Sequence, residues 1–104
     1  MEKIIVDPEV KKFINSLDED TAIKVVWTID LLEDLGYLLR MPYCKKILKN
    51  IFELRIGGKV KVRLFYLFHK QQIIIIHGFI KKTPKLPKNE LKTLTNKIKN
   101  LDLT

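Results

Sequence analysis

The sequence predicts an α+β fold in which an N-terminal strand and a helical hairpin pack on a mainly antiparallel sheet, followed by a C-terminal helix. Apolar and polar residues alternate through much of 51–81, which is typical of strands. Apolar residues recur at three- and four-residue spacing within 8–36 and 88–101, which is typical of amphipathic helices. The strands follow one another with short connections, which favours antiparallel pairing with helices on one side of the sheet. The other face of the sheet is then free to be polar.

Length and composition indicate one globular domain spanning residues 1–104. The chain has 104 residues, of which 46% are hydrophobic, so it resembles a folded domain and not a disordered segment. Its single cysteine, Cys44, cannot form an internal disulfide. The first residues lack a signal-peptide pattern, and no unbroken apolar run approaches the length of a membrane span. We therefore expect a cytoplasmic protein.

The first third of the chain predicts a strand at Lys3–Val6 followed by two helices. The segment Asp7–Glu9 has the N-cap, proline and acidic first turn of a helix start. Asp18 is expected to cap the second helix and Gly36 to end it. We expect Trp27 to lie in the core or to pack against the sheet. The expected buried stripe of the second helix comprises Ala22, Val25, Val26, Ile29 and Leu32.

The rest of the chain predicts a loop, three strands and a helix. The loop covers 37–50, where Met41-Pro42 disfavours a regular helix. A proline-containing link at 83–87 precedes the last helix, 88–101, which lacks a good N-cap side chain because Leu86 and Pro87 precede it. The expected apolar face of this helix comprises Leu91, Leu94, Ile98 and Leu101. The three strands are expected at 51–56, 60–69 and 72–81.

The apolar positions of the first two strands predict how their hairpin is paired. Pairing Leu54 with Val62 keeps the apolar residues of both strands on the face that meets the helices. This register leaves a three-residue loop, 57–59, with a glycine for the left-handed position. It also sets Glu53 opposite Arg63 and Arg55 opposite Lys61.

The other face of this sheet is therefore expected to carry a row of charges. On the third strand His77, Phe79 and Lys81 would join that face, although either face of this strand is apolar enough to be core. The opposite face would take Ile74, Ile76, Gly78 and Ile80. We expect the charged face to be exposed, concave and suited to an anion.

Charge is also segregated by sign along the chain. Residues 1–36 hold four lysines and nine acidic residues, a net charge of −5, whereas 37–104 hold sixteen lysines or arginines and three acidic residues, a net charge of +13. This segregation indicates that a polyanion such as a nucleic acid docks on the second part. An AT-rich genome would explain the number of lysines but not the acidic first third.

Three stretches resemble a known family. They are "MPYCKKILKNIFELR" at 41–55, "FELRIGGKVKVRLFYLF" at 52–68 and "IIIIHGFIKKTPKLPKNEL" at 73–91. In this order and spacing they resemble the RelE/ParE superfamily of toxins, and within it the HigB or Gp49-like branch. The resemblance covers roughly residues 4–100. It implies a RelE-like fold, and the β-α-α-β-β-β-α order expected from the residues agrees with it.

The resemblance implies a type II toxin, a ribosome-dependent mRNA endoribonuclease paired with a small helix-turn-helix, HigA-like antitoxin. Such enzymes work without a metal or cofactor: the 2′-hydroxyl attacks the adjacent phosphate. This chemistry needs a base, an acid and a cation for the charge that develops on the phosphate. The sequence agrees, since it has neither a Cys/His set for zinc nor an acidic cluster for magnesium.

The resemblance assigns catalytic roles to five residues. Arg63 would stabilise the phosphate charge, and Arg55 would contact the scissile or a flanking phosphate. Either Lys81 or Lys82 would hold the phosphate or act as the general acid, and neighbouring cations lower a lysine pKa so that it can become a base. His77 is a candidate acid or base. The expected phosphate-binding residues are Lys59, Lys61 and Lys85.

Structural interpretations of the same residues stay open. Arg63 would be a surface arginine paired with Glu53, His77 a satisfied sheet histidine, and Lys81 with Lys82 a solvated strand end. Glu53 is better explained as a partner of Arg63 than as a base. The chain also departs from RelE, because it has no tyrosine after the basic pair.

Two other functions remain as alternatives. A ParE-like toxin would share the fold and poison DNA gyrase through protein contacts, without needing converging arginine, lysine and histidine side chains. A non-catalytic basic module would bind RNA or DNA, but only Phe65 and Phe79 offer aromatic rings on the charged face, which is few for a stacking platform. A neighbouring gene for a small helix-turn-helix protein would favour either toxin over the module.

Overall fold

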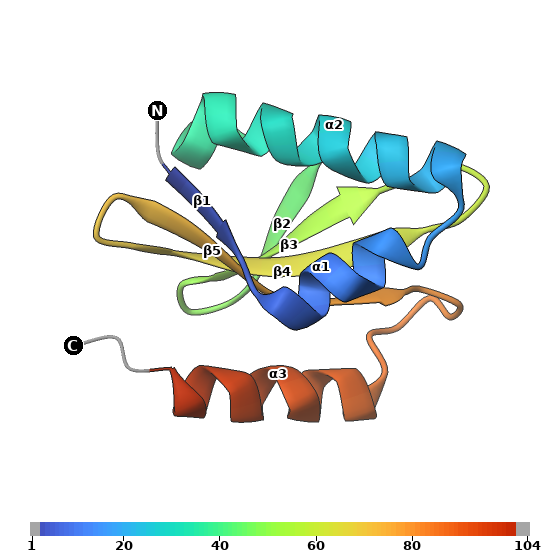
Figure 1. The fold of residues 1–104 in the computed structure, drawn as a ribbon. Coiled ribbons are helices and arrows are strands. Elements are labelled where there is room, and N and C mark those ends of the chain that lie inside the picture. The colour runs from blue at the N-terminus through green and yellow to red at the C-terminus, as the bar shows by residue number, and fades with distance from the viewer. Residues whose placement is uncertain (1–2, 102–104) are drawn as a thin grey trace.

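The computed structural model describes residues 3–101, which form a five-stranded sheet with helices on both faces (Figure 1). The predicted α+β class is confirmed. No helix within 3–101 is both long and apolar enough to cross a membrane. The elements in chain order are β1 (Lys3–Val6), α1 (Pro8–Asn15), α2 (Glu19–Leu35), the 3₁₀ helix η1 (Gly36–Leu38), β2 (Cys44–Leu48), β3 (Ile51–Ile56), β4 (Val62–His69), β5 (Gln72–Ile80) and α3 (Lys88–Asn100).

The strands are ordered β1-β5-β4-β3-β2, with β1 parallel to β5 and the other pairs antiparallel. The mainly antiparallel sheet is thus confirmed. The prediction of a loop over 37–50 was wrong, because this segment contains the last two residues of η1 and the edge strand β2, in which Cys44 pairs with Leu54. Lys45 and Lys46 give β2 no alternating apolar pattern, so only its backbone pairing with β3 defines it as a strand.

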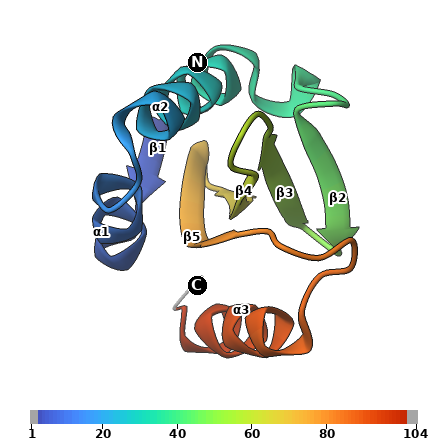
Figure 2. The same ribbon diagram turned by 90° about the vertical axis from the view of Figure 1, so that its right-hand side faces the viewer.

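Helices cover both faces of the sheet, whereas the sequence led us to expect them on one side. The helices α1 and α2 lie over one face and α3 lies under the other (Figures 1 and 2). The central strand β4 is buried from Val62 to Phe68, which is typical of a strand covered on both faces. A second core lies between the sheet and α3 and consists of Ile51, Phe65, Leu67, Ile76, Phe79 and Leu94.

The predicted helix ends are confirmed. Asp7 accepts a hydrogen bond from the Glu9 amide and caps α1, and Asp18 accepts one from the Thr21 amide and caps α2. Gly36 ends α2 with a positive φ of 52°. The start of α3 has no side-chain cap, as expected from the residues that precede it.

The buried stripe of α2 differs from the expected one. Val26 and Trp27 are 52% and 56% exposed, so their predicted burial was wrong. Two threonines take part in the buried stripe instead. Thr28 can be buried because its hydroxyl donates to the Lys24 carbonyl, 2.7 Å away. The buried residues of α2 are Thr21, Val25, Thr28 and Leu32.

The β3–β4 hairpin is paired two residues away from the predicted register. Leu54 lies opposite Leu64 and Arg55 opposite Arg63, so the connection covers residues 57–61 and β4 begins at Val62. A shift by two residues leaves each side chain on its expected face, because strand side chains alternate with a period of two. The predicted left-handed glycine is confirmed, since Gly58 has a φ of +115°.

A β-bulge changes which side chains of β5 share a face. His77 lies opposite Phe65 while Ile75 lies opposite Tyr66, so Ile76 is an extra residue in β5. Ile76 packs in the core between the sheet and α3, on the same side as His77 and Phe79. The predicted placement of Ile74 and Ile76 opposite His77 was therefore wrong, because a strict alternation does not allow for an inserted residue.

Gly78 is expected to be intolerant of a side chain. A Cβ there would lie 2.5 Å from Leu64 Cδ2 and 3.0 Å from a ring carbon of Phe13, and Leu64 is fully buried. Gly78→Ala should therefore lower the free energy of unfolding by about 1–3 kcal/mol, as overpacking does in other cores. Urea denaturation measures this change. Gly57→Ala is the control, because a Cβ there meets nothing within 4 Å; equal stabilities of the two variants would contradict the prediction.

Candidate functional site

A cavity of about 650 Å³ opens where β3 and β5 end and β4 begins, near the 57–61 connection. Six of its lining side chains are positively charged and none is acidic. We call it the basic cavity. Its lining residues are Arg55, Lys59, Val60, Lys61, Arg63, Ile80, Lys81, Lys82, Thr83 and Pro84.

Strand pairing gathers these charges from three parts of the chain. Arg55 on β3 lies directly opposite Arg63 on β4. The amide of Lys81, just after β5, donates to the Lys61 carbonyl at 2.8 Å, which holds the segment after β5 against the hairpin connection. Like charges at such short range repel one another, so this arrangement favours an anion bound among them.

Arg63 is the most buried cation of the basic cavity, with 6% of its surface exposed. Its Nη1 donates to the carbonyls of Val62 and Ile56, at 2.9 and 3.3 Å. Its Nε is buried and has no hydrogen-bond acceptor among the described residues. Burial lowers the pKa of Arg63 while the charge of Glu53 opposes this effect. The guanidinium stays protonated because arginine is so strongly basic.

Glu53 is the acidic partner of these arginines. Its Oε1 lies 3.5 Å from Arg55 Nε and 3.9 Å from Arg63 Nε, and the residue is only 7% exposed. Glu53 reaches Arg63 diagonally, because Phe65 and not Arg63 lies opposite it. The prediction that this charged face is exposed was wrong for Glu53, Arg63 and His77, since α3 and its apolar contacts cover much of the face.

Lys81 is a half-buried amine at the edge of the basic cavity. Burial lowers the pKa of Lys81, and the positive charges of Arg63, Arg55 and Lys61 lower it further against the opposing effect of Glu53. Both causes disfavour the ammonium form. A lysine in these surroundings is neutral more often than an ordinary one and can accept a proton.

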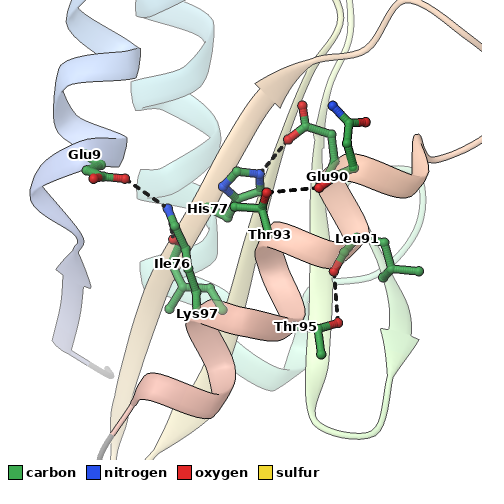
Figure 3. A network of polar contacts seen from close by, with 9 residues as sticks. Glu9, Ile76, His77, Glu90, Leu91, Thr93, Thr95 and Lys97 are labelled. Atoms are coloured by element: carbon green, nitrogen blue, oxygen red, sulfur yellow. Dashed lines mark hydrogen bonds and ion pairs between the residues drawn. The ribbon is translucent and has the colours of Figure 1, made fainter.

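His77 is not part of the lining of the basic cavity. It lies between β5 and α3 and points toward Glu90 (Figure 3). Its Nε2 is 2.7 Å from Glu90 Oε1, and its ring stacks with Phe65 and Phe79 at centroid distances of 6.0 and 6.3 Å. Next to it, Lys97 Nζ donates to the Ile76 carbonyl at 3.1 Å. These contacts connect β5 to α3 and give His77 structural partners.

The structure thus brings together six of the eight residues that the sequence singled out. They are Arg55, Lys59, Lys61, Arg63, Lys81 and Lys82. His77 and the exposed Lys85 do not line the basic cavity. Within 3–101, no three His, Cys, Asp or Glu side chains gather as metal ligands would.

A second cavity, of about 410 Å³, shares Arg55, Lys61 and Arg63 with the basic cavity. We call it the side cavity. Sequence reasoning did not assign Pro42, Tyr43 or Gly57 to a site, because it treated 37–50 as a plain loop and 57–59 as a turn. The one available signal was Tyr43 within "MPYCKKILKNIFELR", directly before the paired strand β2. The full lining is Pro42, Tyr43, Arg55, Gly57, Lys61 and Arg63.

Comparison with known proteins identifies the family. Residues 12–99 match the family model described as phage derived protein Gp49-like (DUF891). No match was found among curated proteins. The matched region includes α2, all strands from β2 to β5 and every residue that lines the two cavities. The chain therefore belongs to the Gp49-like (DUF891) family, which is the HigB-like branch of the RelE/ParE toxins.

Proposed function

We propose that this protein is the toxin of a type II toxin-antitoxin system and cleaves mRNA on the ribosome, thereby inhibiting translation. Family membership supports the toxin, and one observation supports the nuclease: six cationic side chains converge on a single cavity that no acidic residue lines. Such a cavity suits the extra negative charge that develops on a phosphate during RNA cleavage.

The side chains of the basic cavity are sufficient for a reaction without a metal. In the proposed step the 2′-hydroxyl oxygen attacks the adjacent phosphorus, and its proton passes to the neutral amine of Lys81. The bond to the 5′-oxygen breaks, and that oxygen takes a proton from the ammonium of Lys82. Arg63 and Arg55 hold the non-bridging oxygens. The products are a 2′,3′-cyclic phosphate and a 5′-hydroxyl.

In this proposal the two residues outside the basic cavity have lesser roles. His77 is already bound to Glu90 under α3, so we assign it to holding that helix and not to proton transfer. Lys85 follows Thr83 and Pro84 on an exposed segment and would attract the RNA backbone before it enters the cavity.

We also propose a small helix-turn-helix antitoxin as the partner and the cytoplasm as the compartment. An acidic antitoxin segment would suit the basic cavity. The acidic helix α2 offers a second surface on which the antitoxin could dock. This surface is partly apolar, because Ile23, Val26 and Trp27 are each more than half exposed there. Binding that weakens steeply with added salt would favour the basic cavity as the docking site.

The decisive experiment is induced expression in a bacterial host with primer extension on a reporter mRNA. A second reporter lacks its start codon, so that it is transcribed but not translated. We expect growth arrest with new in-frame cuts in the translated reporter alone. Cuts in both reporters would contradict ribosome dependence, and arrest with intact mRNA and altered DNA supercoiling would favour a gyrase-directed, ParE-like toxin.

Lys81 should titrate below the ordinary lysine value of 10.5, for the causes given above. NMR titration of ¹³C-dimethylated lysines measures this pKa, with Lys81→Arg assigning the resonance. Because the native pKa is lowered, the unfolded chain binds more protons between the native value and 10.5, so Lys81 makes stability rise with pH in that window. Lys61→Gln removes one positive neighbour and should move the midpoint upward. A Lys81 midpoint at or above 10.5 would rule out its role as a base.

A further inference from the structure

The side cavity adjoins the basic cavity but has a different chemical character. The two share Arg55, Lys61 and Arg63, so a ligand whose phosphate lies in the basic cavity can extend into the side cavity. The remaining wall of the side cavity is formed by Pro42, Tyr43 and Gly57 and carries no charge. This lining suits an uncharged group attached to a phosphate, and the ring of Tyr43 offers it an aromatic surface.

Tyr43 is held in place by its backbone. Its amide donates to the Arg40 carbonyl at 3.0 Å, and its carbonyl accepts from the Arg55 amide at 2.8 Å. The ring of Tyr43 meets the ring of Trp27 edge to face, at 6.1 Å and an interplanar angle of 60°. Tyr43 is nevertheless 37% exposed. Tyr43 thus provides an aromatic ring that is fixed in position directly before β2, adjoins the basic cavity and remains partly exposed.

We propose that the side cavity is a nucleobase subsite, in which the base next to the phosphate held by Arg55 and Arg63 stacks on Tyr43. This inference rests on the proposed function and assigns its substrate as single-stranded RNA read by base stacking. Proteins bind single strands by combining a cationic groove with aromatic rings, because every base has a π-face that can stack. The volume of about 410 Å³ also falls in the range of small-molecule sites.

Gly57 allows the subsite to be filled by a side chain from another part of its lining. A Cβ at Gly57 meets nothing within 4 Å, and Gly57 does not have the positive φ that strains other residues. Gly57 lines the side cavity and not the basic cavity. Gly57→Leu should therefore occupy the space of a base while leaving the phosphate-binding cations in place.

The test measures binding of the purified protein to three probes by fluorescence anisotropy. The probes are a short unstructured RNA, the same RNA with one base removed, and inorganic polyphosphate. Tyr43→Leu should weaken binding of the intact RNA by about 5- to 100-fold, the usual range for one stacked base. Polyphosphate affinity should stay the same, and Tyr43→Phe should restore RNA affinity. Gly57→Leu should match Tyr43→Leu.

Removing from the RNA the base that stacks on Tyr43 should lower its affinity for the wild-type protein by the same factor. The affinity of the Tyr43→Leu protein should not change when that base is removed. Tyr37→Leu is the matched control, because Tyr37 lines a separate cavity beside Phe68. If Tyr43→Leu fails to fold, Gly57→Leu and the abasic RNA still test the subsite. Equal weakening of RNA and polyphosphate by Tyr43→Leu, or weakening of neither, would overturn the inference.

A further variant separates this failure from failure of the proposed function. Arg55→Gln should weaken binding of RNA and polyphosphate alike, because both use the basic cavity. That result combined with no effect of Tyr43→Leu would overturn the nucleobase subsite alone. No effect of Arg55→Gln on either probe would overturn both the phosphate-binding cavity and the subsite built on it.

Discussion

Arg63→Ala should abolish detectable mRNA cleavage and relieve growth arrest. Arg63 is the buried cation of the basic cavity, and its position is fixed by hydrogen bonds to the carbonyls of Ile56 and Val62. A pre-positioned charge of this kind stabilises the transition state without reorganising. Its loss typically lowers the rate roughly 10²- to 10³-fold. Primer extension on the translated reporter and a time course of growth after induction measure the effect.

Two variants show whether the loss is specific. Lys11→Ala removes one positive charge from an exposed position on α1 and should leave cleavage intact. Arg63→Lys keeps the charge but loses the planar fork of donors, so it should recover only part of the activity. Circular dichroism and thermal unfolding must show that Arg63→Ala is folded. Normal cleavage by a folded Arg63→Ala protein would contradict the proposed role.

Glu53→Ala should have the largest effect on stability, a loss of about 3–5 kcal/mol in the free energy of unfolding. Glu53 is the carboxylate beside Arg55 and Arg63, and both it and Arg63 are less than 10% exposed. Removing one member of a buried ion pair leaves the other charge without compensation. Here the remaining arginines would also repel each other across β3 and β4. Guanidinium denaturation, compared at an unchanged slope, measures the loss.

Glu53→Gln separates charge from packing, since it keeps the shape of the side chain. It should be almost as destabilised as Glu53→Ala if the missing negative charge is the cause. Asp34→Asn, at an exposed position of α2, is the matched control and should change stability little. A stable Glu53→Gln protein that has lost cleavage would instead indicate that Glu53 acts as a base.

The pairing of β3 with β4 shows what the alternation of apolar and polar residues can predict and what it cannot. Alternation placed Arg55 and Arg63 on one face, and this was correct because a two-residue period survives any even shift. The pairing of Arg55 with Lys61 was wrong, because alternation cannot distinguish registers that differ by two. The actual pairing depends on the five-residue connection 57–61, whose conformation is set by contacts around it.

The burial of His77 and of Trp27 was predicted wrongly. On β5 His77 lies on its predicted face, opposite Phe65, but α3 covers that face and Glu90 binds the imidazole. On α2 two buried threonines shift the stripe so that Trp27 faces outward beside Tyr43. The cover over His77 comes from a separate helix that the alternation of β5 does not report, whereas Thr28 can be buried because its hydroxyl donates to the Lys24 carbonyl four residues earlier.

The sequence by itself determined the α+β class, the starts of α1 and α2, the faces of β3 and β4, and the cationic residues from which the site is built. These features follow from periodicity, caps and composition, which act over a few neighbouring residues. Only the tertiary structure decided that α3 covers the second face, that His77 is drawn away from the basic cavity, and that Tyr43 stands beside it. Each of these depends on contacts between different segments of the chain. Several arrangements agree equally well with the local sequence pattern, and small differences in strand register and burial decide which of them forms.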